Sequence, residues 1–175
     1  MDKKLISDLL EEKHQELFKW IEQQEGNYWE KGPENRWTAG QQIQHLVDSI
    51  KPLNLALSLP SFILKAKFGT TNRELRTYDE IVKKYNEKLV QYKDKARDFN
   101  SKVSTPDEKK LIKLVTTLKK QNKELQNKTQ KLSNHKLDNL ILPHPLLGKM
   151  PLREIIMWTA HHTEHHTRDL IENYS

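Results

Sequence analysis

The sequence predicts an all-α fold, and three observations support this prediction. Apolar residues recur at helical spacing through most of the chain, and the 175 residues include only 5 glycines and 7 prolines. Alternation of apolar and polar residues between turn signals, which is typical of strands, is not apparent. We therefore expect long helices joined by a few irregular segments.

Length and composition indicate a single domain covering residues 1–175. Hydrophobic residues make up 35% and charged residues 31%, and no run of about 18 apolar residues could span a membrane. The first residues, MDKKLISDLLEEKHQ, turn acidic where a signal peptide needs an apolar stretch. The chain has no cysteine, which excludes disulfides and thiolate metal sites. We therefore expect a cytoplasmic protein without a membrane partner.

The net charge of +6 and the pI of about 9.3 raise the question of a nucleic-acid partner. The excess is mostly lysine, interleaved with Glu and Asp as in KKYNEKLVQYKDKARD. This pattern is typical of a solvated helix face, so we expect no nucleic-acid partner.

Two helices are predicted in the first third of the chain. The first runs from about Lys3 to Gln24, and a segment with two glycines and a proline, EGNYWEKGPENR, ends it. The second begins at Thr38 as N-cap and continues toward Leu59. Pro52 should bend this helix or end its regular part. Residues 60–76 are expected to be irregular.

Three more helices are predicted after residue 76. The third runs from about Tyr78 to Phe99, with Thr77 and Glu80 spaced as a capping box. The fourth has Thr105 as N-cap and Pro106 in its first turn, and ends near Ser133. A proline-rich loop, HKLDNLILPHPLLGKMP, precedes the last helix, which covers about 152–172.

The fourth helix contains leucines at a seven-residue interval, which resembles a short coiled-coil seam. Asn122 and Thr129 lie between the leucines and weaken such a seam. We favour the interpretation that this is the inward stripe of a bundle helix, with a dimer contact as the alternative. The leucines are Leu111, Leu118, Leu125 and Leu132.

The last helix carries a cluster of four histidines in the segment MWTAHHTEHHTRDL. Two pairs have the i, i+4 spacing that lets two imidazoles share a metal ion, namely His161 with His165 and His162 with His166. The segment does not match HExxH, because Glu164 lies between the wrong pair of positions, so zinc-protease chemistry is not indicated.

Helical phase distinguishes the two pairs. At about 100° per residue from Ile155, His162 and His166 lie within about 20° of the apolar stripe, whereas His161 and His165 lie about 80–120° away. Imidazoles in an interior stripe need partners, because burying an unpaired polar group costs several kcal/mol. A shared metal ion would provide one, while core histidines bonded to other side chains are the alternative.

Catalytic metal sites usually have three protein ligands and an open position. The candidates for the third ligand are His14, His45, His135 and His144, and periodicity does not decide between them. His45 lies away from the apolar face of its predicted helix, so its spacing alone does not select it.

Two segments together resemble the DinB/YfiT superfamily of metal-binding four-helix bundles. They are WTAGQQIQHLVDS, residues 37–49, and HPLLGKMPLREIIMWTAHHTEHHT, residues 144–167. The resemblance implies a four-helix bundle with an additional helix between the second and third bundle helices. It also implies one divalent ion, such as zinc or nickel, held by His45, His162 and His166.

The resemblance further implies a small-molecule substrate, association into homodimers, and metal-dependent chemistry of the hydrolase or low-molecular-weight-thiol S-transferase type. Asp48, one turn beyond His45, is a candidate for orienting a ligand or accepting a proton, although a solvated helix position is an equally good interpretation. The alternative function is a non-catalytic, stress-related module in which the metal only stabilises the helices.

Overall fold

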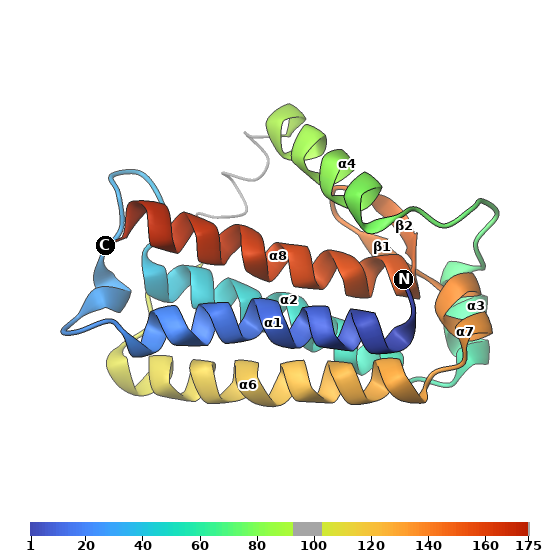
Figure 1. Ribbon diagram of the computed structural model, residues 1–175, viewed down its shortest axis with the longest axis horizontal. Coiled ribbons are helices and arrows are strands. Elements are labelled where there is room, and N and C mark those ends of the chain that lie inside the picture. Colours follow the sequence, from blue (N-terminus) through green and yellow to red (C-terminus); the bar gives the residue numbers. More distant parts are fainter. Residues whose placement is uncertain (93–102, 175) are drawn as a thin grey trace.

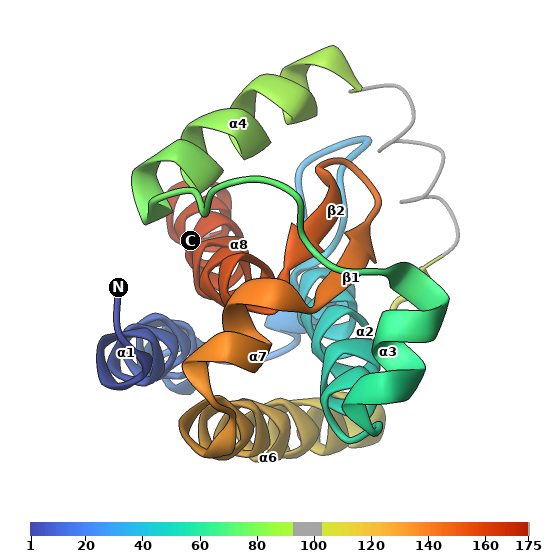
Figure 2. The ribbon, with the colours of Figure 1, turned by 90° about the vertical axis from the view of Figure 1, so that its right-hand side faces the viewer.

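Four long helices form the body of the molecule in this computed structural model, which describes residues 1–92 and 103–174 (Figure 1). They are α1 (Lys3–Glu22), α2 (Ala39–Leu57), α6 (Glu108–Lys131) and α8 (Leu152–Asn173). In the end-on view, α8 lies above and α6 below, with α1 on the left and α2 on the right between them, and each of the four packs against two others (Figure 2). The predicted all-α bundle is confirmed.

The helices begin where side chains can bond their free N–H groups. Thr38 and Thr77 form the capping boxes of α2 and of α4 (Tyr78–Gln91). The prediction that Thr105 caps the fourth helix is wrong, because the Asp107 carboxylate accepts from Lys110 N at 2.7 Å and Pro106 precedes the cap. A carboxylate at this position also interacts favourably with the helix dipole.

Pro52 lies inside α2, which remains helical to Leu57. The part of the prediction that allowed this proline to end the regular helix is therefore not met. A proline inside a helix removes one N–H donor, and here only the Asp48 carbonyl loses its usual partner.

The leucine repeat of α6 faces the interior of the bundle. Leu118 and Leu125 are fully buried and Leu111 nearly so. The polar positions on the same face bond to α1, where Gln126 donates to the Glu11 carboxylate at 2.5 Å and Asn122 does so at 3.3 Å. These contacts support the interpretation as an inward stripe rather than a dimer seam.

Residues 60–76 and the proline-rich loop contain secondary structure that periodicity did not predict. Two short helices, α3 (Ser61–Phe68) and α7 (Asn134–Asn139), are each too short to show a clear apolar period. The antiparallel strands β1 (Ile141–His144) and β2 (Gly148–Pro151) form a hairpin that the expectation of no strand missed. Gly148 closes its turn with a φ of +73°, which glycine adopts without strain. A single-turn 3-10 helix, η1 (Tyr28–Glu30), follows α1.

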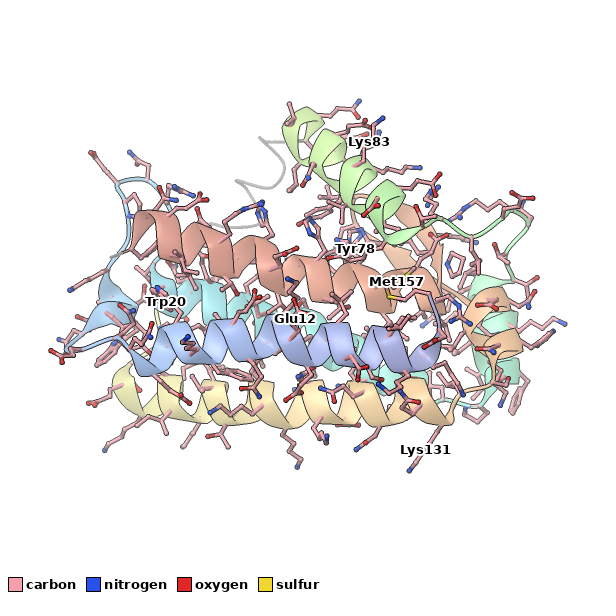
Figure 3. All side chains as sticks on the ribbon, viewed as in Figure 1. Glu12, Trp20, Tyr78, Lys83, Lys131 and Met157 are labelled. Atoms are coloured by element: carbon pink, nitrogen blue, oxygen red, sulfur yellow. The ribbon has the colours of Figure 1, made fainter. Side chains whose placement is uncertain are left out.

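The additional helix, α4, lies across the outer side of α8 (Figures 1 and 2). Its predicted continuation beyond residue 92 lies outside the described residues. Its N-terminal end is attached through the fully buried Glu154, which accepts from Arg73 at 2.6 and 2.7 Å and from the backbone N–H of Arg76 at 2.7 Å. Tyr78 lies between α4 and α8 (Figure 3) and reaches Glu164 at 3.4 Å. These contacts position α4 beside the histidine-rich half of α8.

None of the helices described in residues 1–92 and 103–174 combines the length and apolar character that crossing a membrane requires.

We predict that Leu118→Ala lowers the free energy of unfolding by about 2–5 kcal/mol, because it removes a fully buried side chain and leaves a cavity. Ile112→Ala on the same helix is the matched control, because Ile112 is exposed and should change stability by less than about 0.5 kcal/mol. Urea unfolding followed by circular dichroism measures both. Equal losses for the two variants would contradict the placement of the α6 stripe.

Candidate metal centre

Three histidines from two helices converge at the interface between α2 and α8. His45 lies in the second turn of α2, and His162 and His166 lie one turn apart on α8. The Nε2 atom of His162 is 3.0 Å from that of His45 and 3.2 Å from that of His166. One nitrogen from each ring falls within 4.8 Å of the others. The structure thus brings together the three residues that the resemblance selected.

The spacing of these nitrogens fits a shared metal ion. Ligands ~2.0–2.1 Å from a tetrahedral ion lie about 3.3–3.4 Å from one another. The two Nε2 separations are close to this value. An imidazole nitrogen carries either a proton or a lone pair, so His162 Nε2 cannot donate a hydrogen bond to one of its two neighbours and accept one from the other. Hydrogen bonds alone therefore do not satisfy all three nitrogens, whereas a shared metal ion would. This donor set could therefore hold an ion without rearrangement of the helices.

A chain of polar contacts fixes the orientation of His166. Its Nδ1–H donates to Gln42 Oε1 at 2.8 Å, which leaves the Nε2 lone pair facing the other two histidines. Gln42 in turn donates to Asp169 Oδ2 at 2.7 Å, and Asp169 pairs with Arg36. Sequence reasoning missed Gln42, although its position three residues before His45 places both on neighbouring parts of one helix.

Two tryptophans flank the ligand set. Trp158 stacks on the ring of His162, with centroids 4.5 Å apart and planes 19° from parallel. The ring of Trp37, in the residues before α2, lies 4.8 Å from that of His45. These indoles limit the rotation of the imidazoles, so they do more than fill the core.

Burial holds all three imidazoles in the neutral form that can ligate a metal. It lowers the pKa of His45 to about 4, although the charge of Asp48 acts in the opposite direction. It also lowers the pKa of His162 and of His166 well below the usual value, and the neighbouring histidines add to this effect. His45 is only partly buried, so the site approaches the surface on its side.

The second histidine pair is less exposed than helical phase predicted. His161 is buried and His165 is half-buried, because Tyr78 and Tyr85 of α4 cover this flank of α8. Neither joins the convergent nitrogens. The prediction that His161 and His165 lie on the flank of α8 was correct. Their burial under α4 could not be predicted from the helical periodicity of α8.

The other candidates for the third ligand do not join the convergent nitrogens. His14 is buried on α1, where its Nδ1 bonds to Leu10 O at 2.8 Å and its Nε2 is 3.4 Å from Thr163 Oγ1. His135 is exposed on α7. His144, on β1, accepts from two backbone N–H groups.

Two carboxylates, those of Asp48 and Glu164, lie near the histidine cluster. Asp48 is exposed and accepts from Gln44 at 2.9 Å, and its charge opposes the lowering of the His45 pKa by burial. Glu164 pairs with Lys13 at 3.0 Å and with His161 at 3.3 Å, and it joins α1, α8 and α4.

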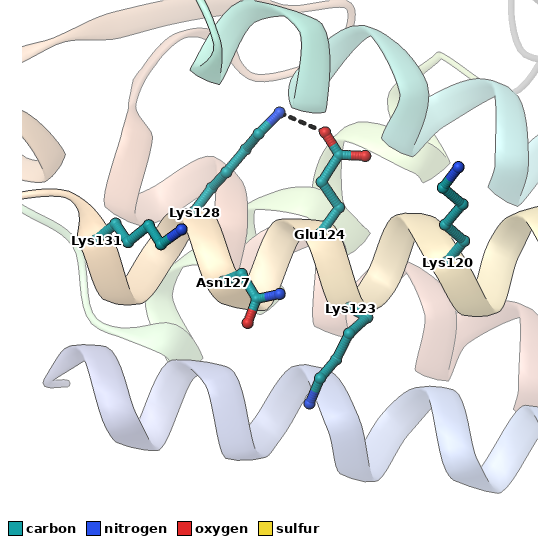
Figure 4. A pocket seen from close by; sticks show the side chains of 6 residues that line it. All are labelled: Lys120, Lys123, Glu124, Asn127, Lys128 and Lys131. Atoms are coloured by element: carbon teal, nitrogen blue, oxygen red, sulfur yellow. Dashed lines mark hydrogen bonds and ion pairs between the residues drawn. The ribbon is translucent and has the colours of Figure 1, made fainter.

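Two surface depressions lie away from the histidines. One runs along the outer face of α6 and is lined mainly by lysines, including Lys128 paired with Glu124 (Figure 4). The other lies beside Met1, Arg76 and Met157. Neither includes a ligand histidine.

The fold and the site together define a helical bundle with a three-histidine cluster able to hold a metal ion. The model of the DinB superfamily matches residues 5–170, nearly the whole chain, and the protein belongs to this superfamily. Searches of curated proteins and of solved structures found no match.

We predict that the metal-free protein loses stability as the pH falls from about 6.5 to 4. Burial lowers the pKa of His14 to about 4 in the folded state, while the unfolded chain keeps a value near 6.5. Below pH 6.5 the unfolded state therefore binds protons that the folded state does not, which favours unfolding. His14 alone should account for about 3 kcal/mol at pH 4.

Urea unfolding of chelator-treated protein at pH 7.5, 6 and 5 tests this. His14→Gln should flatten the pH dependence, while His135→Gln, at an exposed position, should leave it unchanged. Stability that is constant across this range would contradict the neutral, buried assignment.

Proposed function

We propose that this protein binds one divalent metal ion through His45, His162 and His166 and acts as a metal-dependent enzyme on a small molecule. The observation that carries the proposal is the approach of three Nε2 atoms, at 3.0 and 3.2 Å, across the interface of α2 and α8. Membership of the DinB superfamily supports it. The proposed reaction type is hydrolysis or the transfer of a low-molecular-weight thiol.

A divalent ion held by three neutral imidazoles supplies a Lewis acid that activates water or a thiol at neutral pH. The protein's own residues keep the imidazoles neutral and fix their direction. Gln42 holds the Nδ1 proton of His166, and Trp158 stacks on His162. Imidazole suits zinc, nickel and other divalent ions, so cellular availability decides between them.

Access to the site is proposed on the side of His45, the only partly buried ligand. Asp48 lies one turn further along α2 and is exposed on the same helix, where its carboxylate is a candidate proton acceptor. Asp48→Asn should then reduce the rate of the reaction without reducing the amount of bound metal.

The competing function is a non-catalytic module in which the ion joins α2 to α8. A coordination sphere of three histidine nitrogens plus solvent favours the enzyme, and a fourth protein ligand favours the module. Metal analysis of the purified protein, followed by hydrolase and thiol-transfer screens with that metal restored, separates the two.

We predict that replacing His45, His162 or His166 by Ala lowers the metal content from about one ion per chain to near zero. Each change removes one of three ligands and leaves a pair of much weaker affinity. His161→Ala is the matched control, because His161 is buried on the same helix but does not join the convergent nitrogens. Atomic emission on dialysed protein measures the content, and full occupancy in His166→Ala would refute the ligand set.

We also predict that removing the metal lowers the melting temperature without unfolding the helices. The four bundle helices share an extensive apolar core that does not require the ion. An ion that binds only the folded state stabilises it by mass action, by about 2.7 kcal/mol at 100 times its Kd. Circular dichroism before and after chelation measures both effects, and loss of the helical signal would assign the ion a purely structural role.

A further inference from the structure

A second cluster of buried polar atoms lies beside the histidine triad, under α4. Four ring nitrogens here are buried and have no hydrogen-bond partner among the described residues: His144 Nε2, Trp158 Nε1, His161 Nε2 and His162 Nδ1. They are half of the unpaired buried side-chain atoms in the described part of the chain. Each such atom costs about 1–3 kcal/mol, so proteins rarely gather them without a use.

All four rings surround one side chain of α4, Tyr85. Its ring centroid lies 5.6 Å from that of Trp158, 5.8 Å from His161, and 6.3 Å from both His144 and His162. In each pair the planes are 69° or more apart, so the rings meet Tyr85 edge to face. The four rings that carry the unpaired nitrogens therefore pack around Tyr85, which covers them.

Two of these nitrogens are donors, whatever the state of the metal site. The Nδ1 atom of His144 accepts from Leu146 N at 3.2 Å and from Leu147 N at 3.0 Å, so it carries no proton. In the neutral ring the proton must then be on Nε2. The indole Nε1 of Trp158 is a donor only. The two rings are neighbours, with centroids 4.1 Å apart.

We propose that His144 Nε2–H and Trp158 Nε1–H bind an sp² oxygen of a small molecule, either a carboxylate or a carboxamide oxygen, with Tyr85 as the outer wall of the site. Two neutral donors satisfy one acceptor oxygen without burying an unpaired cation. Of the side chains of α4 only Ile81 and Tyr85 are buried, and the proposed route of entry is a local shift of this helix. The site goes beyond the proposed metal chemistry, because neither donor ligates the ion.

Acetate and acetamide are matched probes for this site, because they have similar shape and differ in charge. The protein is labelled with ¹⁵N, treated with chelator, and titrated with each probe against sodium chloride of equal ionic strength. Trp158→Phe identifies the Trp158 indole N–H signal among the four tryptophans. We expect this signal to move downfield and to saturate, because the donor gains an acceptor.

The chain offers an internal control in Trp29. Its Nε1 is also buried without a partner, but it packs against Tyr28 at the far end of α1. Its signal should not move, and Trp29→Phe should bind the probes as the unmodified protein does.

His144→Asn tests the second donor with the fold preserved. The Asn side-chain oxygen can accept from the backbone N–H groups of the turn, as Nδ1 does, but no donor remains at the Nε2 position. Affinity should fall roughly tenfold, while the rest of the spectrum is unchanged. Retained affinity in this variant would overturn the proposal.

The two probes also distinguish the ligand class. Saturation by acetate alone identifies a carboxylate site, and saturation by acetamide alone identifies a carboxamide site. Saturation by both identifies a site that recognises the oxygen without regard to charge. If neither probe saturates, or if sodium chloride or the Trp29 signal gives the same shift, the proposal is wrong. Because the ion is absent from the titration, none of these results depends on the proposed metal function.

Discussion

The approach of three imidazole nitrogens across the interface of α2 and α8 is the constraint around which the surrounding residues are arranged. Two of these rings, those of His162 and His166, are almost entirely buried. Buried imidazoles are neutral, and three neutral rings within hydrogen-bond distance share too few protons to satisfy one another. This arrangement costs free energy unless the three lone pairs coordinate one common partner. A divalent ion is such a partner.

The residues around the triad hold its imidazole rings in this arrangement. Gln42, Asp169 and Arg36 form one line of contacts that ends at His166. The charged members of this line lie toward the surface, and the neutral amide of Gln42 lies inside, so no isolated charge is buried against the ligand ring. On the other side, Trp158 restrains His162 by stacking on its ring.

Sequence periodicity predicted the parts of the fold that are long and amphipathic, and it failed where an element is short or where another element covers it. The four bundle helices and the inward direction of His162 and His166 followed from the 3.6-residue period. The hairpin at residues 141–151 did not, because four-residue strands have no measurable alternation. The burial of His161 depends on Tyr85, which is distant in sequence and contacts it only after α4 folds across α8. His45 was selected by family resemblance, because its helix face is polar by itself.

One helix, α8, explains why these features occur together. Fifteen of its 22 residues are buried, although many are polar, so it must satisfy its own polar groups on three sides. Toward α1 it does so with threonines whose hydroxyls bond back to the preceding turn, as Thr163 does to Thr159 O at 3.2 Å. Toward α2 it presents His162 and His166, and toward α4 it presents Trp158 and His161. The first side is satisfied within the helix itself, whereas the other two retain nitrogens that the chain does not fully pair. On those two sides some groups are paired, as His166 Nδ1 is with Gln42 and Glu154 is with Arg73, but the nitrogens left over are the ones proposed to bind a metal ion and a small molecule.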